Sequence, residues 1–253
     1  PLFRSIVSAH RGYSDLDGKG KLVLYPASAG ATYKMAYNPS STIAALRSVL
    51  EAYGRKPDML ARIPAIPMRT EDGKEMIFPA EVWERTGDTG IPQLLPVFPW
   101  RIYGVGREGL ETARNTYLYG REVQQSRAQG REKLDNVWAA CLGLTDQASG
   151  LTLERLSDGP YRFPAFRQTN DAWTPDLNEG NSGMMGMQEM LLQEVNGKLL
   201  LFPAWPREWD VHFKLHAPGK TTVEAEWKGG KLVNLTVIPK EREKDVVNCL
   251  GGK

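Results

Sequence analysis

The chain has 253 residues, of which 41% are hydrophobic and 25% are charged, so it can bury a substantial core in one large domain or in two smaller ones. Its 32 basic and 30 acidic residues leave a net charge of +2, which argues against binding nucleic acid or a membrane through bulk charge. No apolar run approaches the length of about 18 residues that a membrane-spanning helix needs.

Metal and cofactor chemistry has little support in the sequence. The two cysteines, Cys141 and Cys249, lack metal-ligand spacing, and the three histidines are His10, His212 and His216. We therefore expect no metal site and no cofactor. His212 and His216 lie an even number of residues apart in a strand-like segment, so both should point to one face of that strand.

The first clear element is a helix that begins at Ser40 or Ser41 and ends before Gly54. A second helical piece is expected over residues 57–62. Residues 63–105 contain six prolines and several aromatic residues. We expect this region to form a long, ordered, irregular loop, and loops of that length are usually functional.

Helical periodicity returns after this region and continues almost to residue 196. A second aromatic loop is expected over residues 160–180. The helices are predicted at 107–119, 130–143, 145–157 and 182–195.

The pattern changes at Gly197, where alternating strands replace helices. Gly229 and Gly230 form a hairpin signal between the last two strands. The sequence therefore predicts a helical domain over residues 1–196 and a small antiparallel β domain over residues 197–253. The strands are predicted at 198–202, 209–215, 221–227 and 231–238.

The two aromatic loops also carry carboxylates, and this combination suits carbohydrate. Sugar rings stack on aromatic side chains, and sugar hydroxyls pair with carboxylates and amides. Cleavage of a glycosidic bond needs two acidic groups. Each single residue is more often a solvated or helix-capping group. The candidates are Glu81, Glu84, Asp88, Asp171, Asp176 and Glu179.

The segment around Asp176 leads directly into the helix predicted at 182–195. A loop that enters a packed helix can hold the Asp176 carboxylate rigidly enough for catalysis. Alternatively, Asn178, Asn181 or Ser182 simply caps that helix. The residues alone leave both interpretations open.

Several motifs together resemble a known family. Downstream they are Gly186–Gln193, Leu199–Pro206, Trp209–Val211 and Glu224–Leu232, and upstream they are Tyr37–Arg47, Pro96–Gly106 and Ala113–Thr116. In this colinear order they resemble the C-terminal part of glycoside hydrolase family 95-like proteins, which are α-L-fucosidase-type enzymes. The upstream motifs are most similar to the uncharacterised bacterial branch of that group.

The resemblance implies a mainly α fold with a β tail. It corresponds to the C-terminal half of a six-hairpin α/α toroid followed by a small antiparallel β domain. A half toroid leaves apolar helix surface uncovered. We therefore expect a missing N-terminal segment or a second chain to complete it.

The resemblance also implies inverting hydrolysis of glycosidic bonds, with Asp176 as the base that activates water. Asn178 occupies the position of the family's Asp, and either Asn178 or Glu179 would orient that water. The family's general acid lies upstream of the matched motifs, so the acid would come from Glu81 or Glu84, or from the missing half. Ala31 stands where the uncharacterised branch usually has Glu.

The expected substrate-binding residues are Trp100, Arg101, Tyr103, Trp173 and Glu84. The resemblance implies an oligosaccharide or glycan partner and a periplasmic or extracellular bacterial location. The dispersed basic residues argue against a nucleic-acid partner. The alternative function is a non-catalytic protein of the same fold that binds carbohydrate or completes an assembly.

Overall fold

The computed structural model describes residues 17–52, 57–87, 90–128, 134–157 and 177–251. The chain clusters into two compact units, which are treated separately below. Unit 1 comprises residues 1–103 and 109–132, and unit 2 comprises residues 104–108 and 133–253. The boundary expected near residue 196 falls inside unit 2.

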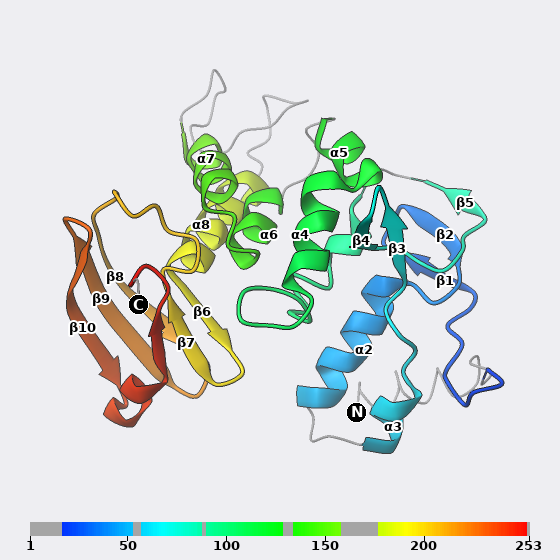
Figure 1. The fold of residues 1–253 in the computed structure, drawn as a ribbon, viewed down its shortest axis with the longest axis horizontal. Coiled ribbons are helices and arrows are strands. Elements are labelled where there is room, and N and C mark those ends of the chain that lie inside the picture. The colour runs from blue at the N-terminus through cyan, green and yellow to red at the C-terminus, as the bar shows by residue number, and fades with distance from the viewer. Residues whose placement is uncertain (1–16, 53–56, 88–89, 129–133, 158–176, 252–253) are drawn as a thin grey trace. The chain divides into compact units, whose positions relative to one another are not determined.

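Unit 1 contains a small antiparallel sheet and a separate hairpin (Figure 1). The sheet has the order β1–β2–β5, with β1 at Ala27–Ala29, β2 at Tyr33–Ala36 and β5 at Arg85–Thr86. The hairpin pairs β3 (Met68–Glu71) with β4 (Lys74–Ile77).

The turn of this hairpin is the dipeptide Asp72-Gly73, and both residues have positive φ, at 48° and 74°. A two-residue hairpin turn with two left-handed residues favours Asp-Gly. The dipeptide was therefore a hairpin signal inside the region that we expected to be an irregular loop.

Unit 1 also contains four α-helices and a short 3-10 helix within its described residues. Helix α2 buries Ile43, Ala44 and Leu50 on one face, which confirms the helix expected from residue 40. The piece expected over residues 57–62 is confirmed as α3. The elements are α2 (Ser40–Ala52), α3 (Pro57–Arg62), η1 (Pro92–Leu94), α4 (Leu110–Tyr119) and α5 (Arg121–Ala128).

A buried threonine attaches the hairpin to α4. The Thr116 hydroxyl accepts a hydrogen bond from the Ile77 backbone N–H at 2.8 Å and donates to the Thr112 carbonyl oxygen at 2.8 Å. Thr116 is almost fully buried, so its hydroxyl needs both an acceptor and a donor partner in place of water. The contact fixes the end of β4 against the helix.

Unit 2 begins with three helices that pack on one another. Asn136 of α6 is fully buried, and its Nδ2 donates to the Ser182 carbonyl oxygen at 2.8 Å and to Thr152 Oγ1 at 3.2 Å. One amide therefore joins all three helices. They are α6 (Asp135–Cys141), α7 (Thr145–Leu156) and α8 (Leu177–Leu191).

Two three-stranded sheets follow in unit 2. One has the order β11–β7–β6 and the other β10–β9–β8. The strands are β6 (Leu192–Val195), β7 (Lys198–Leu201), β8 (Val211–Ala217), β9 (Thr221–Lys228), β10 (Lys231–Ile238) and β11 (Val246–Asn248), and η2 (Lys240–Asp245) precedes β11.

The strand predictions after Gly197 are largely confirmed. Val223, Ala225 and Trp227 are buried on β9, as the alternation predicted. Gly229 and Gly230 form the turn to β10, with φ of 57° and 74°.

The expected mainly α toroid is wrong. Among the described residues, 38% are helical and 27% are in strands, and the strands form four small sheets, so the fold mixes helices and strands. Strands occur in both units rather than only in a C-terminal tail. Because no toroid is formed, the inference that a second chain or a missing segment completes one loses its premise.

One predicted helix also ends at the wrong residue. The helix expected over 182–195 stops at Leu191, and residues 192–195 form β6, which pairs with β7. Backbone pairing with β7 overrides the helical pattern of this short segment. Within the part of the chain that the structure describes, no helix is long and apolar enough to cross a membrane.

Candidate functional site

The structure describes only part of the segment that carries the expected catalytic residues. Asp176 and Trp173 lie outside the described residues, as do the candidates Asp88 and Asp171. Asn178 and Glu179 belong to the first turn of α8. The geometry of a site can therefore be built only from the other residues.

Three expected substrate-binding residues lie in the loop between η1 and α4. The Arg101 guanidinium lies 5.5 Å from the centroid of the Phe98 ring, and Trp100 is half-buried. Tyr103 lies against Gly109, and its pKa is raised mainly by burial, with Arg47 opposing and Glu75 adding to that shift. These contacts are those of a packed loop.

Glu84, the fourth of these residues, has different neighbours. Its Oε1 accepts a hydrogen bond from the Tyr25 hydroxyl at 3.0 Å, and the Tyr25 ring lies 6.0 Å from the Tyr37 ring, measured between centroids. Tyr25 is 40% exposed. An exposed aromatic ring beside a carboxylate is typical of carbohydrate-binding sites. We call Tyr25, Tyr37, Asn38, Glu81 and Glu84 the tyrosine–glutamate cluster.

Backbone pairing places the two glutamates of this cluster. The Glu81 N–H donates to the Tyr37 carbonyl oxygen at 3.0 Å, and the Glu84 N–H donates to the Lys34 carbonyl oxygen at 3.2 Å. Tyr37 and Val82 also form an antiparallel bridge. The segment from Glu81 to Glu84 therefore runs alongside β2 and its continuation.

Asn38 fixes the Glu81 side chain. Asn38 has φ of 50°, a left-handed conformation that asparagine tolerates better than most residues. Its Oδ1 accepts from the Leu24 N–H at 2.9 Å, and its Nδ2 donates to Glu81 Oε1 at 2.8 Å. Asn38 is 5% exposed, so this amide is a rigid support for a carboxylate at the surface.

The carboxylate of Glu84 changes the pKa of the Tyr25 hydroxyl. Its pKa is raised above the usual value, first by the hydrogen bond to Glu84 and then by the charge of Glu84. The neutral phenol is the form that donates the hydrogen bond, which is why the negative Glu84 favours it.

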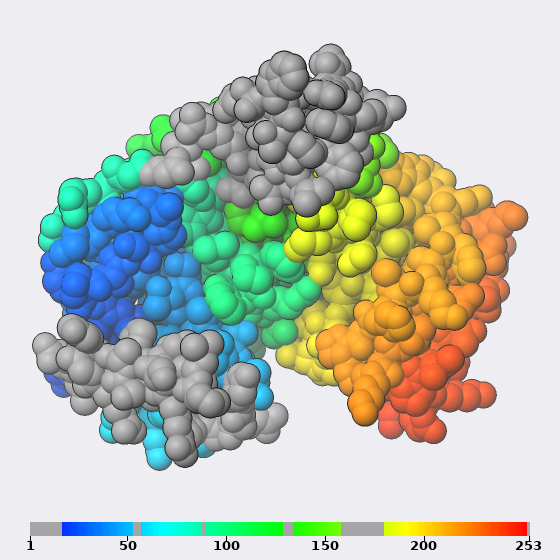
Figure 2. Space-filling view, turned by 180° about the vertical axis from the view of Figure 1, so that it is seen from behind, coloured from blue at the N-terminus to red at the C-terminus, as the bar shows by residue number. Residues whose placement is uncertain are grey.

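A shallow groove of about 690 Å³ adjoins the cluster along the chain. Pro26 follows Tyr25, Arg85 follows Glu84, and both line the groove. The blue atoms in Figure 2, which belong to the first described residues of unit 1, lie at the molecular surface on the face shown. Ala31 is exposed in the turn between β1 and β2. The groove is lined by Pro26, Ala27, Ser28, Lys34, Met35, Arg85, Thr86 and Gly87.

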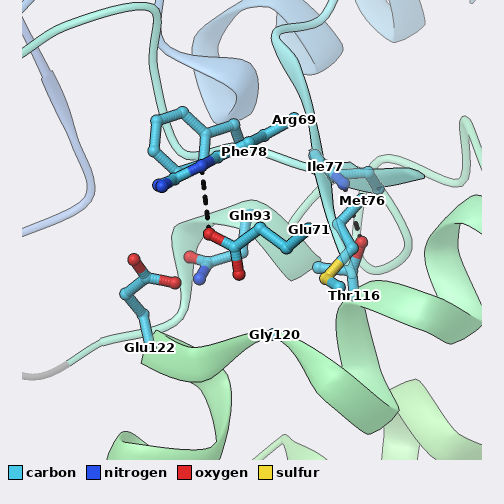
Figure 3. Close-up of a pocket in the computed structure, with 9 residues that line it drawn as sticks. All are labelled: Arg69, Glu71, Met76, Ile77, Phe78, Gln93, Thr116, Gly120 and Glu122. Carbon is cyan, nitrogen blue, oxygen red and sulfur yellow. Dashed lines mark hydrogen bonds and ion pairs between the residues drawn. The ribbon is translucent and has the colours of Figure 1, made fainter. Parts of the chain in front are cut away.

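A separate small cavity lies among β3, β4, η1 and the start of α5 (Figure 3). Figure 3 shows the Gln93 amide between the carboxylates of Glu71 and Glu122, and Arg69 pairs with Glu71 at 3.0 Å. Gln93 is 2% exposed, and its Oε1 has no hydrogen-bond partner among the residues that the structure describes. The cavity volume of about 10 Å³ admits one water-sized group, so it is too small for a sugar.

Burial raises the pKa of the Tyr33 phenol in β2. Its pKa is raised to about 12, first by burial and then by the negative charge of Glu122. Tyr33 packs on Trp83 with 4.6 Å between ring centroids. It therefore serves the core of unit 1 rather than the tyrosine–glutamate cluster.

Metal ligands do not gather in the described parts of either unit. Among those residues, no group of three or more His, Cys, Asp or Glu side chains could hold a metal ion. His212 and His216 both lie on β8, where His212 Nε2 contacts Glu224 at 3.2 Å and His216 Nδ1 contacts Thr222 at 3.1 Å.

The motifs that carried the family resemblance have structural contacts in unit 2. Gln193 Nε2 donates to the Ala140 carbonyl oxygen at 3.0 Å and to the Glu189 carbonyl oxygen at 2.8 Å. Trp205 Nε1 donates to the Trp209 carbonyl oxygen at 2.9 Å. These motif residues thus hold together the junction of helices and strands.

Comparison of the chain with models of known protein families gives no match, and comparison with curated proteins gives no significant match.

Sequence reasoning had named Glu81 and Glu84 but had missed their partners. Tyr25, Tyr37 and Asn38 lie more than 40 residues before the glutamates, so the cluster depends on pairing between distant segments. The only local hint was Asn38, an asparagine at the end of a strand, where a left-handed residue is common.

Proposed function

We propose that this chain is a carbohydrate-active protein that binds saccharide at the tyrosine–glutamate cluster, and that it is a glycoside hydrolase or part of one. The observation that carries the proposal is the exposed Tyr25 ring, whose hydroxyl donates to Glu84 at 3.0 Å. The resemblance of the motifs to family 95-like proteins supports the same substrate class.

The chemistry of the cluster fits a sugar. The apolar face of a pyranose ring can stack on Tyr25, while its hydroxyls donate to Glu84 and Glu81. Both carboxylates already have one fixed partner, Tyr25 and Asn38 respectively. Little side-chain entropy is therefore lost when a sugar binds.

For hydrolysis, we propose Asp176 as the base that activates water, with Asn178 or Glu179 orienting that water. This part of the proposal rests on the resemblance of the segment before α8 to the family motif. An inverting mechanism needs its two carboxyl groups about 6.5–9.5 Å apart, so that a water molecule fits between substrate and base. A periplasmic or extracellular bacterial setting would fit such an enzyme.

The proposal is tested by turnover and by binding. Turnover is measured on a panel of aryl glycosides and bacterial polysaccharides, and binding on oligosaccharides by calorimetry. The variant Asp176→Asn should lose at least about 100-fold in turnover and keep its binding, because a general base contributes on that scale. Full turnover by this variant would end the assignment of Asp176.

Glu84→Gln tests the cluster itself. We expect it to weaken oligosaccharide binding about 5- to 10-fold, because a charge-assisted hydrogen bond is replaced by a neutral one. The matched control is Glu111→Gln, which changes an exposed glutamate of α4 in the same unit. Equal binding by both variants would show that the cluster is not the saccharide site.

The alternative function is non-catalytic carbohydrate binding. The tyrosine–glutamate cluster favours it equally, because stacking and hydrogen bonding require no chemistry. If the chain binds oligosaccharides but hydrolyses no substrate of the panel, the result supports this alternative. Absence of both binding and turnover would refute the carbohydrate proposal in either form.

A further inference from the structure

The sheet of unit 1 aligns two cations and a hydroxyl in one row. In the register of the sheet, Ser28 of β1 lies opposite Lys34 of β2, and Lys34 lies opposite Arg85 of β5. Residues directly opposite in neighbouring antiparallel strands point to the same face, with Cβ atoms about 4.5–5.5 Å apart. All three residues line the groove beside the tyrosine–glutamate cluster.

Two cations opposite each other on one sheet face repel and destabilise the pair. Among the described residues, neither Lys34 nor Arg85 forms an ion pair with a carboxylate. The nearest carboxylate along the chain, Glu84, receives the Tyr25 hydroxyl instead. The arrangement is therefore unfavourable unless a negative group enters the groove.

In the sheet of unit 2, by contrast, a strand lysine lies opposite a carboxylate that neutralises its charge. Lys214 of β8 lies opposite Glu224 of β9, and the two form an ion pair at 3.2 Å. The position opposite Lys34 holds Arg85 instead of a carboxylate. This contrast within one chain indicates that the charge on the groove serves a ligand.

The chemistry of the row indicates the kind of ligand. A guanidinium presents a planar fork that matches a carboxylate or sulfate, and a lysine adds a mobile point charge. Ser28 and Thr86 add hydroxyl groups to the same lining. A groove of about 690 Å³ lies within the range of small-molecule sites, about 300–1,000 Å³.

We propose that this groove binds the anionic group of an acidic saccharide, a carboxylate or a sulfate ester, through Lys34 and Arg85. The inference rests on the proposed saccharide-binding function and names its substrate class. The negative Glu84 repels an anion at one end and accepts neutral hydroxyls there, while Lys34 and Arg85 attract the anion. The two ends together orient the acidic sugar.

Paired probes test the proposal with the full chain. Calorimetry compares a galacturonic acid oligosaccharide with its methyl ester, and a sulfated galactan oligosaccharide with its desulfated form. We expect the wild-type chain to bind at least one acidic probe about 10-fold more tightly than its neutral partner. The pair that shows this preference identifies the anion as carboxylate or sulfate.

The double variant Lys34→Gln/Arg85→Gln should lose the preference for acid and still bind the neutral probe. The matched control, Lys19→Gln/Arg121→Gln, removes one lysine and one arginine from exposed positions of the same unit. It should keep the preference. Thermal unfolding of each variant verifies that the chain remains folded.

Three results would overturn the inference, and they can be told apart. Equal binding of acidic and neutral probes refutes the anionic class and leaves the carbohydrate proposal standing. A preference that survives in Lys34→Gln/Arg85→Gln, or that both double variants lose equally, shows that the groove is not the anion site. Failure of every probe to bind refutes the proposed function itself.

Discussion

Replacing Gly186 with alanine should destabilise unit 2, although alanine is the better helix former. Gly186 lies within α8, where a Cβ atom would clash with Asn136 Nδ2 and would stand 2.9 Å from Thr152 Oγ1. Asn136 is fully buried, and its amide donates to Thr152 and to the Ser182 carbonyl oxygen. The amide therefore cannot move away without losing hydrogen bonds.

The magnitude follows from these contacts. Losing two hydrogen bonds costs about 1 kcal/mol each. Crowding of a close-packed helix contact adds about 1 kcal/mol. The higher helix propensity of alanine offsets about 1 kcal/mol of this sum. The net loss is about 2 kcal/mol, which lowers Tm by about 6 °C for a unit of this size.

The assay should report on unit 2 alone, because the chain has two compact units. Hydrogen exchange measured by mass spectrometry on peptides of α6, α7 and α8 meets this need, with whole-chain Tm as a second readout. The matched control is Gly150→Ala in α7, where a Cβ atom would meet nothing within 4 Å. That variant should gain up to about 1 kcal/mol.

A double-mutant cycle completes the test. In an Asn136→Ala background the amide is gone, so adding alanine at Gly186 should cost much less than it does in the wild type. If Gly186→Ala stabilises unit 2 as much as Gly150→Ala, the close contact with Asn136 does not exist and the reasoning fails.

Three further outcomes follow from local contacts. Asn38→Ala should lower the free energy of unfolding by about 3 kcal/mol, measured in urea, because it removes buried hydrogen bonds and places alanine at positive φ. Asn38→Gly should lose less, because glycine avoids the cost of positive φ but still lacks the hydrogen bonds. Equal losses of stability in the two variants would contradict this reasoning. The Tyr33 phenol should titrate at about 12 in ultraviolet absorbance, so stability falls as pH rises from about 10 to about 12, and a midpoint near 10 would show that Tyr33 is not buried. The pKa of Glu224 is lowered first by Lys214 and then by His212, so the stabilising contribution of Glu224 is lost as pH falls through that pKa. In carboxyl NMR, Lys214→Ala should raise this pKa more than His212→Ala does, and the reverse order would refute the assignment.

Local sequence patterns are sufficient to predict those helices and strands whose buried side chains recur at regular spacing. The alternation of Val223, Ala225 and Trp227 with polar residues predicts β9, because side chains of a strand alternate between buried and exposed faces. The pair Gly229-Gly230 supplies the left-handed turn to β10. The helical spacing of Ile43 and Leu50 likewise predicts α2. In each case the signal lies within a few consecutive residues.

The local pattern fails where a strand buries few side chains. Residues of β3 are mostly exposed, so no alternation marks this strand, and only Asp72-Gly73 indicated its hairpin. The segment Leu192–Val195 has a helical pattern but becomes β6, because its backbone pairs with β7. Because these strands went unpredicted, nothing in the local pattern opposed the mainly α toroid that the family resemblance implied.

In the candidate site, too, only some of the residues could be predicted from the sequence. Glu81 and Glu84 could be named from the sequence, because carboxylates in an aromatic segment suit sugars. The sequence did not reveal that Tyr25 and Asn38 are their partners. It also did not reveal that Lys34 lies opposite Arg85. Which side chains meet is decided by the register between strands about 50 residues apart, and register arises only when the strands pair in the folded chain.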